Sequence, residues 1–321
     1  MSLCCFSSST AAAAAARRFL LPHLFLGRRR HRHDQVRYTI LHHPRTHTTA
    51  APPAAAASTI RLSPSQQRQV SLYVDALLDW NQRLTRPLVA APVFFSGAQR
   101  MNLTAVTDEG EVMTRHVADS LAVLPPLERA YRGDLGGMRL VDVGSGAGLP
   151  GLILAVARPS WKFTLLESMQ KRCLFLEHAV EVMGLSNVDV VCDRAECHDT
   201  LLYFDHFMCL IGQNVGQSPD FREAFDVAVA RAVAELKVLA EYCLPLVRID
   251  GLFIAAKGHN PHEEIKNAKS AVHKLGASML EICDVESMGP HGQRTAVVYI
   301  KECITPKKYP RHPGTPSKMP L

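Results

Sequence analysis

What this 321-residue chain lacks already narrows its class. No stretch approaches about 20 uninterrupted apolar residues, so we expect no membrane-spanning helix. The nine cysteines include no C-x-x-C pair, and their scatter indicates reduced thiols in an intracellular compartment. Cys192, Cys197 and His198 come closest to a metal cluster but lack a fourth ligand, so we expect no metal site.

Acids are nearly missing from residues 1–60, which contain eight arginines against the single acid Asp34. The formal net charge of +6 therefore belongs to this leader, and the rest of the chain is nearly neutral. A leader rich in Arg, Ser and Ala and poor in acids resembles an organellar transit peptide. Its early Ser and Ala favour a chloroplast, with a mitochondrion as the alternative, while a basic RNA-binding arm is the other interpretation.

Three alternating glycines follow a short apolar run in the segment VDVGSGAGLPG, residues 141–151. Apolar residues before the turn suit a buried parallel strand, and Gly144, Gly146 and Gly148 let the backbone bend and approach a ligand. A dinucleotide site has the spacing G-x-G-x-x-G, but Leu149 occupies its third glycine position, which disfavours a nicotinamide or flavin cofactor. The pattern is similar to motif I of methyltransferases that use S-adenosylmethionine (SAM).

Apolar periodicity predicts an α/β fold with a seven-stranded Rossmann-like sheet and an N-terminal helical extension. One extension helix starts at a capping box, and a second runs from Asp108 to about Leu124, where Pro125 and Pro126 should end it. Later helices are expected at 152–157, from Gln170 to Gly184, from the fourth strand to about Val247, and after Pro261. The predicted strands are 138–143, 162–166, 188–192, 225–230, 252–256, 279–285 and 296–300, with the last two as an antiparallel edge pair.

Four segments are expected along the chain: a transit peptide at 1–60, the helical extension at 61–130, a methyltransferase domain at 131–304 and a basic, Pro-rich tail at 305–321. The tail has no acid after Glu302, and its prolines favour extended forms. It is therefore expected either to contact phosphates or to be a solvated terminus. Its bases are Lys307, Lys308, Arg311 and Lys318.

Ligands of such sheets bind at the carboxyl ends of the strands, where three groups are candidates. Glu167 follows the second strand at the distance expected of an acid that binds a ribose, although a solvent-facing Glu is the alternative. Residues 193–196, DRAE, follow the third strand. They are expected to meet an adenine, and the alternative is a plain capping acid. Arg231 follows the fourth strand, where a surface role is the alternative.

The fourth strand also limits the acceptor of the methyl group. It lacks the N/D-P-P-Y motif of amino-group methyltransferases and the nucleophilic Cys of C5-pyrimidine enzymes. Arg231 cannot be a general base, but its guanidinium holds carboxylates or phosphates. The acceptor is therefore expected to need no deprotonation, and guanine N7 is such an atom.

Several motifs together resemble the RsmG (GidB) family, which methylates N7 of one guanine in the decoding-region loop of bacterial small-subunit rRNA. They include NLTAVTD (102–108), DVGSGAGLPG (142–151), TLLES (164–168), FDVAVARA (225–232) and the tail YPRHPGTPSKMPL (309–321). The resemblance implies a SAM-binding set of Gly144, Leu149, Ala195, Glu196 and Arg231, to which the residue chemistry adds Gly146 and Glu167. It implies no settled acid, base or nucleophile.

The resemblance also implies that the partner is small-subunit rRNA or the small ribosomal subunit. Other functions stay open: methylation of another RNA or a small molecule, or a SAM-binding ribosome-assembly factor without activity. His116 and Asp119 share a helix face and either border the pocket or form an ordinary pair. Residues 83–99 and 197–213 depart from the family, and we hypothesise that one or both are retained introns in the gene model.

Overall fold

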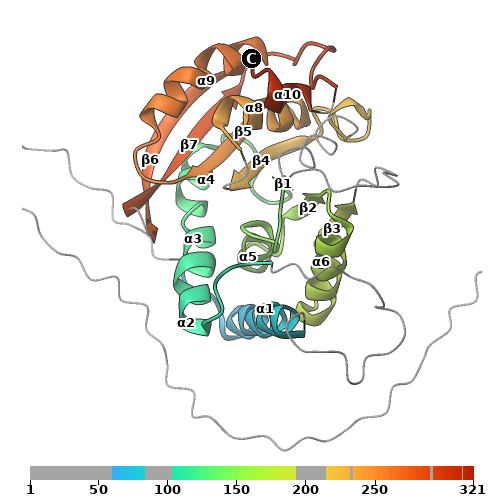
Figure 1. Cartoon of the computed structure of the whole chain (residues 1–321), viewed down its shortest axis with the longest axis vertical. Coiled ribbons are helices and arrows are strands. Elements are labelled where there is room, and N and C mark those ends of the chain that lie inside the picture. Colours follow the sequence, from blue (N-terminus) through green and yellow to red (C-terminus); the bar gives the residue numbers. More distant parts are fainter. Residues whose placement is uncertain (1–59, 84–102, 193–214, 232–233, 290–291, 313) are drawn as a thin grey trace, which may run out of the picture. The chain divides into compact units, whose positions relative to one another are not determined.

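The computed structural model describes residues 60–83, 103–192, 215–231, 234–289, 292–312 and 314–321. Its centre is a seven-stranded sheet in the order β3-β2-β1-β4-β5-β7-β6, which confirms the predicted Rossmann-like architecture (Figure 1). The strands are β1 (Arg139–Val143), β2 (Lys162–Glu167), β3 (Val188–Cys192), β4 (Phe225–Arg231), β5 (Val247–Lys257), β6 (Ala277–Gly289) and β7 (Gly292–Lys301).

Strand direction determines where a ligand can lie on this sheet. Strands β1 to β5 pair in parallel, so their carboxyl ends meet at one edge. Strand β7 is antiparallel to both β5 and β6, which confirms the antiparallel edge pair. The start of β7 therefore returns to the edge at which β4 and β5 end.

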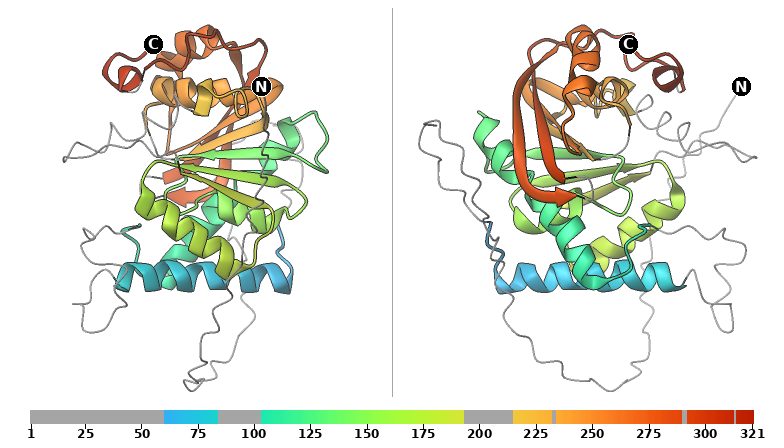
Figure 2. Two further views of the ribbon diagram at one scale, coloured as in Figure 1. Left: turned by 90° about the vertical axis from the view of Figure 1, so that its right-hand side faces the viewer. Right: turned by 60° about the vertical axis from the view of Figure 1, so that its left-hand side comes forward.

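Helices cover both faces of the sheet. On one face lie α5 (Gly151–Ala157) and α6 (Gln170–Met183), and α1 (Pro64–Arg83) packs across both (Figure 2). The other face carries α8 (Leu236–Cys243) and α9 (His262–Lys274), packed on each other. This arrangement follows from right-handed crossovers between parallel strands. Among the described helices, none is long and apolar enough to cross a bilayer.

The prediction that Pro125 and Pro126 end a helix was wrong. The segment is broken earlier, into α2 (Glu109–Val112), the π-helical turn η2 (Met113–Val117) and α3 (Ala118–Leu121). Both prolines instead lie in the first turn of α4 (Leu124–Ala130). Proline suits that position because the first helical N–H groups have no intrahelical acceptor to lose.

The helix after β4 is also shorter than predicted. It ends at Cys243, a 3₁₀ turn η3 (Leu244–Leu246) follows, and Val247 already begins β5. Pro245 accounts for the break because it lacks the N–H that a continuing α-helix needs. Strands β5, β6 and β7 are each longer than their apolar patterns indicated. Residues 84–99 and 197–213, in the two segments suspected as introns, lie outside the described residues.

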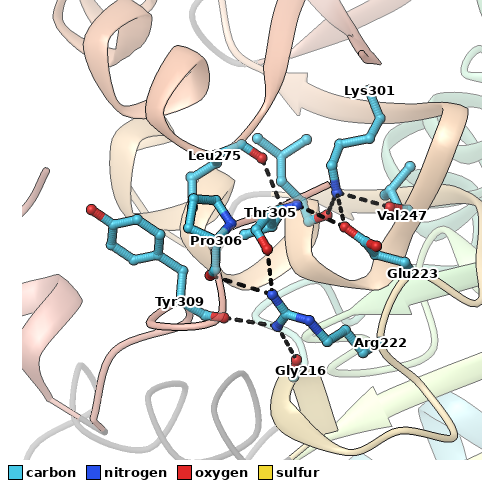
Figure 3. A network of polar contacts seen from close by, with 10 residues as sticks. Gly216, Arg222, Glu223, Val247, Leu275, Lys301, Thr305, Pro306 and Tyr309 are labelled. Atoms are coloured by element: carbon cyan, nitrogen blue, oxygen red, sulfur yellow. Dashed lines mark hydrogen bonds and ion pairs between the residues drawn. The ribbon is translucent and has the colours of Figure 1, made fainter. Parts of the chain in front are cut away.

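A partly buried network of polar contacts holds the start of the C-terminal tail to the body (Figure 3). Arg222 donates to the carbonyls of Gly216, Thr305 and Tyr309 at 2.6 to 2.9 Å. Beside it, the Glu223 carboxylate accepts from the Thr305 backbone N–H at 2.7 Å and from Lys301 Nζ at 3.1 Å. These contacts fix the start of the tail, at Thr305, to Arg222 and Glu223.

Further along, Arg311 forms a bidentate contact with the fully buried Glu241 carboxylate of α8, with Nη2 to Oε2 at 2.7 Å. A single helical turn, α10 (Thr315–Lys318), follows, so the expectation of a wholly extended tail was wrong. Of the four tail bases predicted to contact phosphates, Arg311 is engaged with Glu241. Lys307, Lys308 and Lys318 are exposed.

We predict that Arg311→Ala lowers the free energy of unfolding by about 3 kcal/mol, because the charge of Glu241 stays buried without its partner. Arg129→Ala is the matched control, since Arg129 pairs with Glu281 at 2.7 Å with both side chains partly exposed, and it should lose under about 1 kcal/mol. Urea denaturation measures both variants. Equal losses would contradict a docked tail.

Candidate active site

The glycine turn after β1 is pinned to the end of β2. The backbone N–H groups of Gly144 and Ser145 both donate to the Leu166 carbonyl, at 2.9 and 3.1 Å. Gly144, Gly146 and Gly148 all have positive φ, at 76°, 60° and 84°, a region that strains other residues. Among the described residues, a Cβ on Gly146 would meet no atom closer than 3.9 Å, so within this part of the chain the backbone faces space that a ligand can occupy.

Glu167, the last residue of β2, lies directly beside this turn. It is fully buried, which excludes the solvent-facing alternative. Its Oε2 accepts from the Gly146 N–H at 2.9 Å, and its Oε1 accepts from the N–H groups of Ser168 and Met169. The carboxylate also accepts from the Ser168 hydroxyl, and it therefore holds the turn in place.

The N-terminal extension supports the turn from the other side. The Tyr73 hydroxyl of α1 donates to the Ala147 carbonyl at 2.7 Å, and the side chain is fully buried. Burial raises the pKa of Tyr73 well above its usual value, so the phenol stays protonated and can donate. This contact was not predicted from the sequence. The one available signal was a Tyr on an apolar helix face, since buried tyrosines need a hydrogen-bond partner.

Two arginines meet one buried carboxylate next to the turn. Arg231 Nη1 at the end of β4 lies 2.9 Å from Asp119 Oδ2, and Arg294 Nε at the start of β7 lies 3.0 Å from Asp119 Oδ1. The Asp119 side chain is 3% exposed and those of Arg231 and Arg294 are 12% and 23% exposed. The cluster carries one excess positive charge and suits an anionic or electron-rich ligand. The sequence contained no signal for Arg294.

The helix pair His116 and Asp119 is divided between two networks. His116 Nε2 lies 2.9 Å from the Thr104 hydroxyl, whereas Asp119 contacts the two arginines. Burial, and then the charge of Arg231, lower the pKa of His116, so its ring is neutral at pH 7. The imidazole therefore positions the 103–106 segment.

The structure brings together most of the predicted site residues. Gly144, Gly146 and Glu167 form one wall, and Arg231 ends the strand next to β1. Leu149 is 6% exposed and packs in the apolar cluster under α1. Ala195 and Glu196 lie outside the described residues.

The donor set fits an adenosine-containing cofactor. An open glycine backbone beside a buried carboxylate matches a ribose with two hydroxyls. Within the described ranges, no group of three His, Cys, Asp or Glu side chains is placed to hold a metal ion. Arg231 stays charged and His116 is already hydrogen-bonded, so the site is suited to orient an acceptor that carries its own lone pair.

Comparisons with known proteins agree with this site. The GidB family model, described as rRNA small subunit methyltransferase G, matches residues 93–291. Proteins named Ribosomal RNA small subunit methyltransferase G are 39% identical in Symbiobacterium thermophilum (82% of this chain, 93% of that protein) and 42% in Carboxydothermus hydrogenoformans (71% and 88%). In Bacillus cytotoxicus the identity is 37%, over 82% and 93%. Among solved structures, M. jannaschii TYW2 in complex with AdoMet has a TM-score of 0.38 and 12% identity, covering 56% of this chain and 76% of that one.

Asp142, in β1 beneath the turn, should make stability depend on pH. It is fully buried, its Oδ2 accepts from the Gly151 N–H at 2.9 Å, and its Oδ1 has no hydrogen-bond partner among the described residues. Burial raises the pKa of Asp142 from 3.8 to about 6. Between these pH values the folded chain binds a proton that the unfolded chain has released. Stability from this group is therefore present at low pH and is lost as pH rises to 6.

Asp142→Asn removes this titration, so relative to the wild type we expect it to gain about 3 kcal/mol of unfolding free energy between pH 4 and pH 7. Denaturation at both pH values measures the difference, in which constant packing effects cancel. Asp189→Asn, at an exposed position of β3, is the control and should show no such gain. A pH-independent difference for Asp142→Asn would contradict the buried, proton-binding carboxyl.

Proposed function

The chain belongs to the GidB family, rRNA small subunit methyltransferase G, and on this premise we propose that it transfers a methyl group from SAM to N7 of a guanine in the small-subunit rRNA of an organellar ribosome. The observation that carries this proposal is the open glycine turn, held by buried Glu167 and flanked by Arg231. All of these residues lie inside the range matched by the family model.

Residues of the turn would hold the cofactor, which supplies a methyl group activated on a sulfonium. Gly144, Gly146 and Leu149 are proposed to contact the cofactor, with support from the open space at Gly146, and Glu167 is proposed to bind its ribose. Ala195 and Glu196 are proposed to meet the adenine, as the family resemblance implies. Arg231, at the end of β4, is proposed to complete the pocket.

The atom that accepts the methyl group is proposed to be one that needs no general base, because the family resemblance implies no settled acid or base. Bound SAM would supply a methyl group on a sulfonium, which would leave as the thioether S-adenosylhomocysteine, and guanine N7 would accept the methyl group with its own free lone pair. No proton leaves, and the products are a cationic 7-methylguanine and S-adenosylhomocysteine. The residues of the site therefore contribute by placing N7 in line with the methyl group and by excluding water.

This reaction can be tested by incubating the full chain with labelled SAM and with small ribosomal subunits that lack the modification. Reduction followed by aniline scission cuts RNA at 7-methylguanine, and we expect a single cut in the decoding-region loop. Label without that cut would indicate another position or base. SAM binding without any label would favour the ribosome-assembly factor.

The same assay has a matched pair of variants. Glu167→Gln places an amide where three backbone N–H groups need an acceptor, so we expect SAM affinity to fall roughly 10- to 100-fold. Glu177→Gln, exposed on α6, should leave it unchanged. Equal SAM affinities for both variants would rule out the proposed role of Glu167.

We also propose that residues 1–60 direct the protein to the chloroplast, with the mitochondrion as the alternative. The support is compositional, namely eight arginines, one acid and an early Ser and Ala bias. Import of the full chain into isolated chloroplasts and mitochondria, with protease protection as the measurement, is expected to favour chloroplasts. A chain without residues 1–60 is the control, and equal import of both would contradict the proposal.

A further inference from the structure

A pocket of about 240 Å³ lies between the start of α9 and the β6/β7 hairpin, separate from the glycine turn. The loop from β5 to α9 forms one wall and the two hairpin strands form the other. Its lining is mixed: Pro261 and Ile282 are apolar, and the other side chains carry hydrogen-bonding groups, two of them imidazoles. The hydrogen-bonding side chains of the lining are those of His259, Asn260, His262, Asp284, Gln293 and Thr295.

Strand register places this pocket close to the proposed site of methyl transfer. Arg231 pairs with Ala256, which pairs in turn with Ala296, so these residues form one row across β4, β5 and β7. Thr295 is the next residue on β7. Since neighbouring strands are about 4.8 Å apart, the Ala296 backbone lies on the order of 10 Å from that of Arg231, and the Thr295 side chain points to the opposite, α9 face of the sheet. The pocket is therefore at the same edge of the sheet.

The backbone around the pocket departs from regular geometry at several residues. Asn260 has a positive φ of 52°, which is uncommon outside glycine. Gly292 has φ 118°, and a Cβ there would lie 3.2 Å from the His259 ring. The pairing of β6 with β7 is irregular between Asp284 and Met288. Such irregularities tend to occur beside functional sites.

The charge of the pocket argues against a phosphate ligand. Asp284 is an acceptor when ionised, and Glu263 and Glu264 occupy the first turn of α9 next to the pocket. The Thr295 hydroxyl lies a long 3.4 Å from Asp284 Oδ1, which leaves acceptor capacity on the carboxylate. A ligand that presents N–H donors therefore fits better than an anion.

A nucleobase offers such donors on its edge and a flat face for imidazoles to stack on. RNA is read in sequence mainly through unpaired bases that are splayed out, stacked on aromatic side chains and hydrogen-bonded at their edges. The amides of Asn260 and Gln293 add both donors and acceptors. With the Ala296 backbone about 10 Å from that of Arg231, the pocket is within reach of a nucleotide roughly three stacked steps from the target.

We propose that this pocket binds an unpaired base of the RNA substrate close to the methylated guanine, with Asp284 accepting from the N–H groups of that base. The proposal rests on the proposed function, since it takes RNA as the substrate. Asp284 is a positioning residue, because it contacts neither the cofactor nor the reacting atoms.

The test compares Asp284→Asn with Glu286→Gln, a nearby exposed acid of β6 that does not line the pocket. The full chain is titrated with a decoding-loop RNA oligonucleotide, and steady-state kinetics are measured on unmodified small subunits. Asp284→Asn is expected to weaken RNA binding and raise the KM for subunits about tenfold, with kcat and the KM for SAM unchanged. Glu286→Gln should match the wild type in every parameter.

The outcomes separate this proposal from the proposed function. A wild type that methylates subunits, with Asp284→Asn equal to it in RNA affinity and KM, overturns the pocket and leaves the methyltransferase intact. A wild type that methylates nothing, with RNA binding still weakened by Asp284→Asn alone, overturns the function and supports the pocket. A loss of kcat or of SAM affinity without a change in RNA affinity also overturns the pocket. Thermal unfolding of both variants, together with Thr295→Val, separates misfolding from lost recognition.

Discussion

The site depends on one buried interaction, the hydrogen bonds of the Glu167 carboxylate to the backbone of the glycine turn and of its own strand end. Three N–H groups that would otherwise lie buried without acceptors are satisfied there, and a buried unsatisfied group is costly. Because the turn is also pinned through Leu166, the ends of β1 and β2 behave as one rigid unit. The positive-φ glycines can hold their open conformation only inside that unit.

The N-terminal extension is part of the same constraint. Helix α1 packs on α5 and α6, and Tyr73 passes through this layer to the turn. Asn81, near the end of α1, accepts from the Leu103 N–H at 3.0 Å, which leads to Thr104 and His116. Tyr73 thus connects the middle of α1 to the glycine turn, and Asn81 connects the end of α1 to the 103–106 segment, so the extension contributes to the shape of the site.

Pattern alone located the elements well and their ends and contacts poorly. Strands β1 to β4 alternate or run apolar in short, bounded segments, which is why their positions were predicted to within about a residue. The prolines of α4 were misread because proline both ends a helix and begins one, and only tertiary packing decides between these. Gly144, Gly146 and Glu167 could be predicted as one site because their spacing in the sequence is typical of a glycine turn followed by a ribose-binding acid. Tyr73 and Arg294 reach the site from distant segments, which no local pattern records.

Charge explains why recognition of RNA must be local in this protein. Outside the leader the chain is nearly neutral, so its net charge gives little nonspecific affinity for phosphates. The positive groups at the site are few and engaged: Arg231 and Arg294 share Asp119, and Lys257 contacts Glu264 at 2.6 Å. Affinity for one guanine among many must therefore come from shaped contacts to bases and from the folded substrate itself. The proposed base pocket between α9 and the β6/β7 hairpin would supply a contact of this kind.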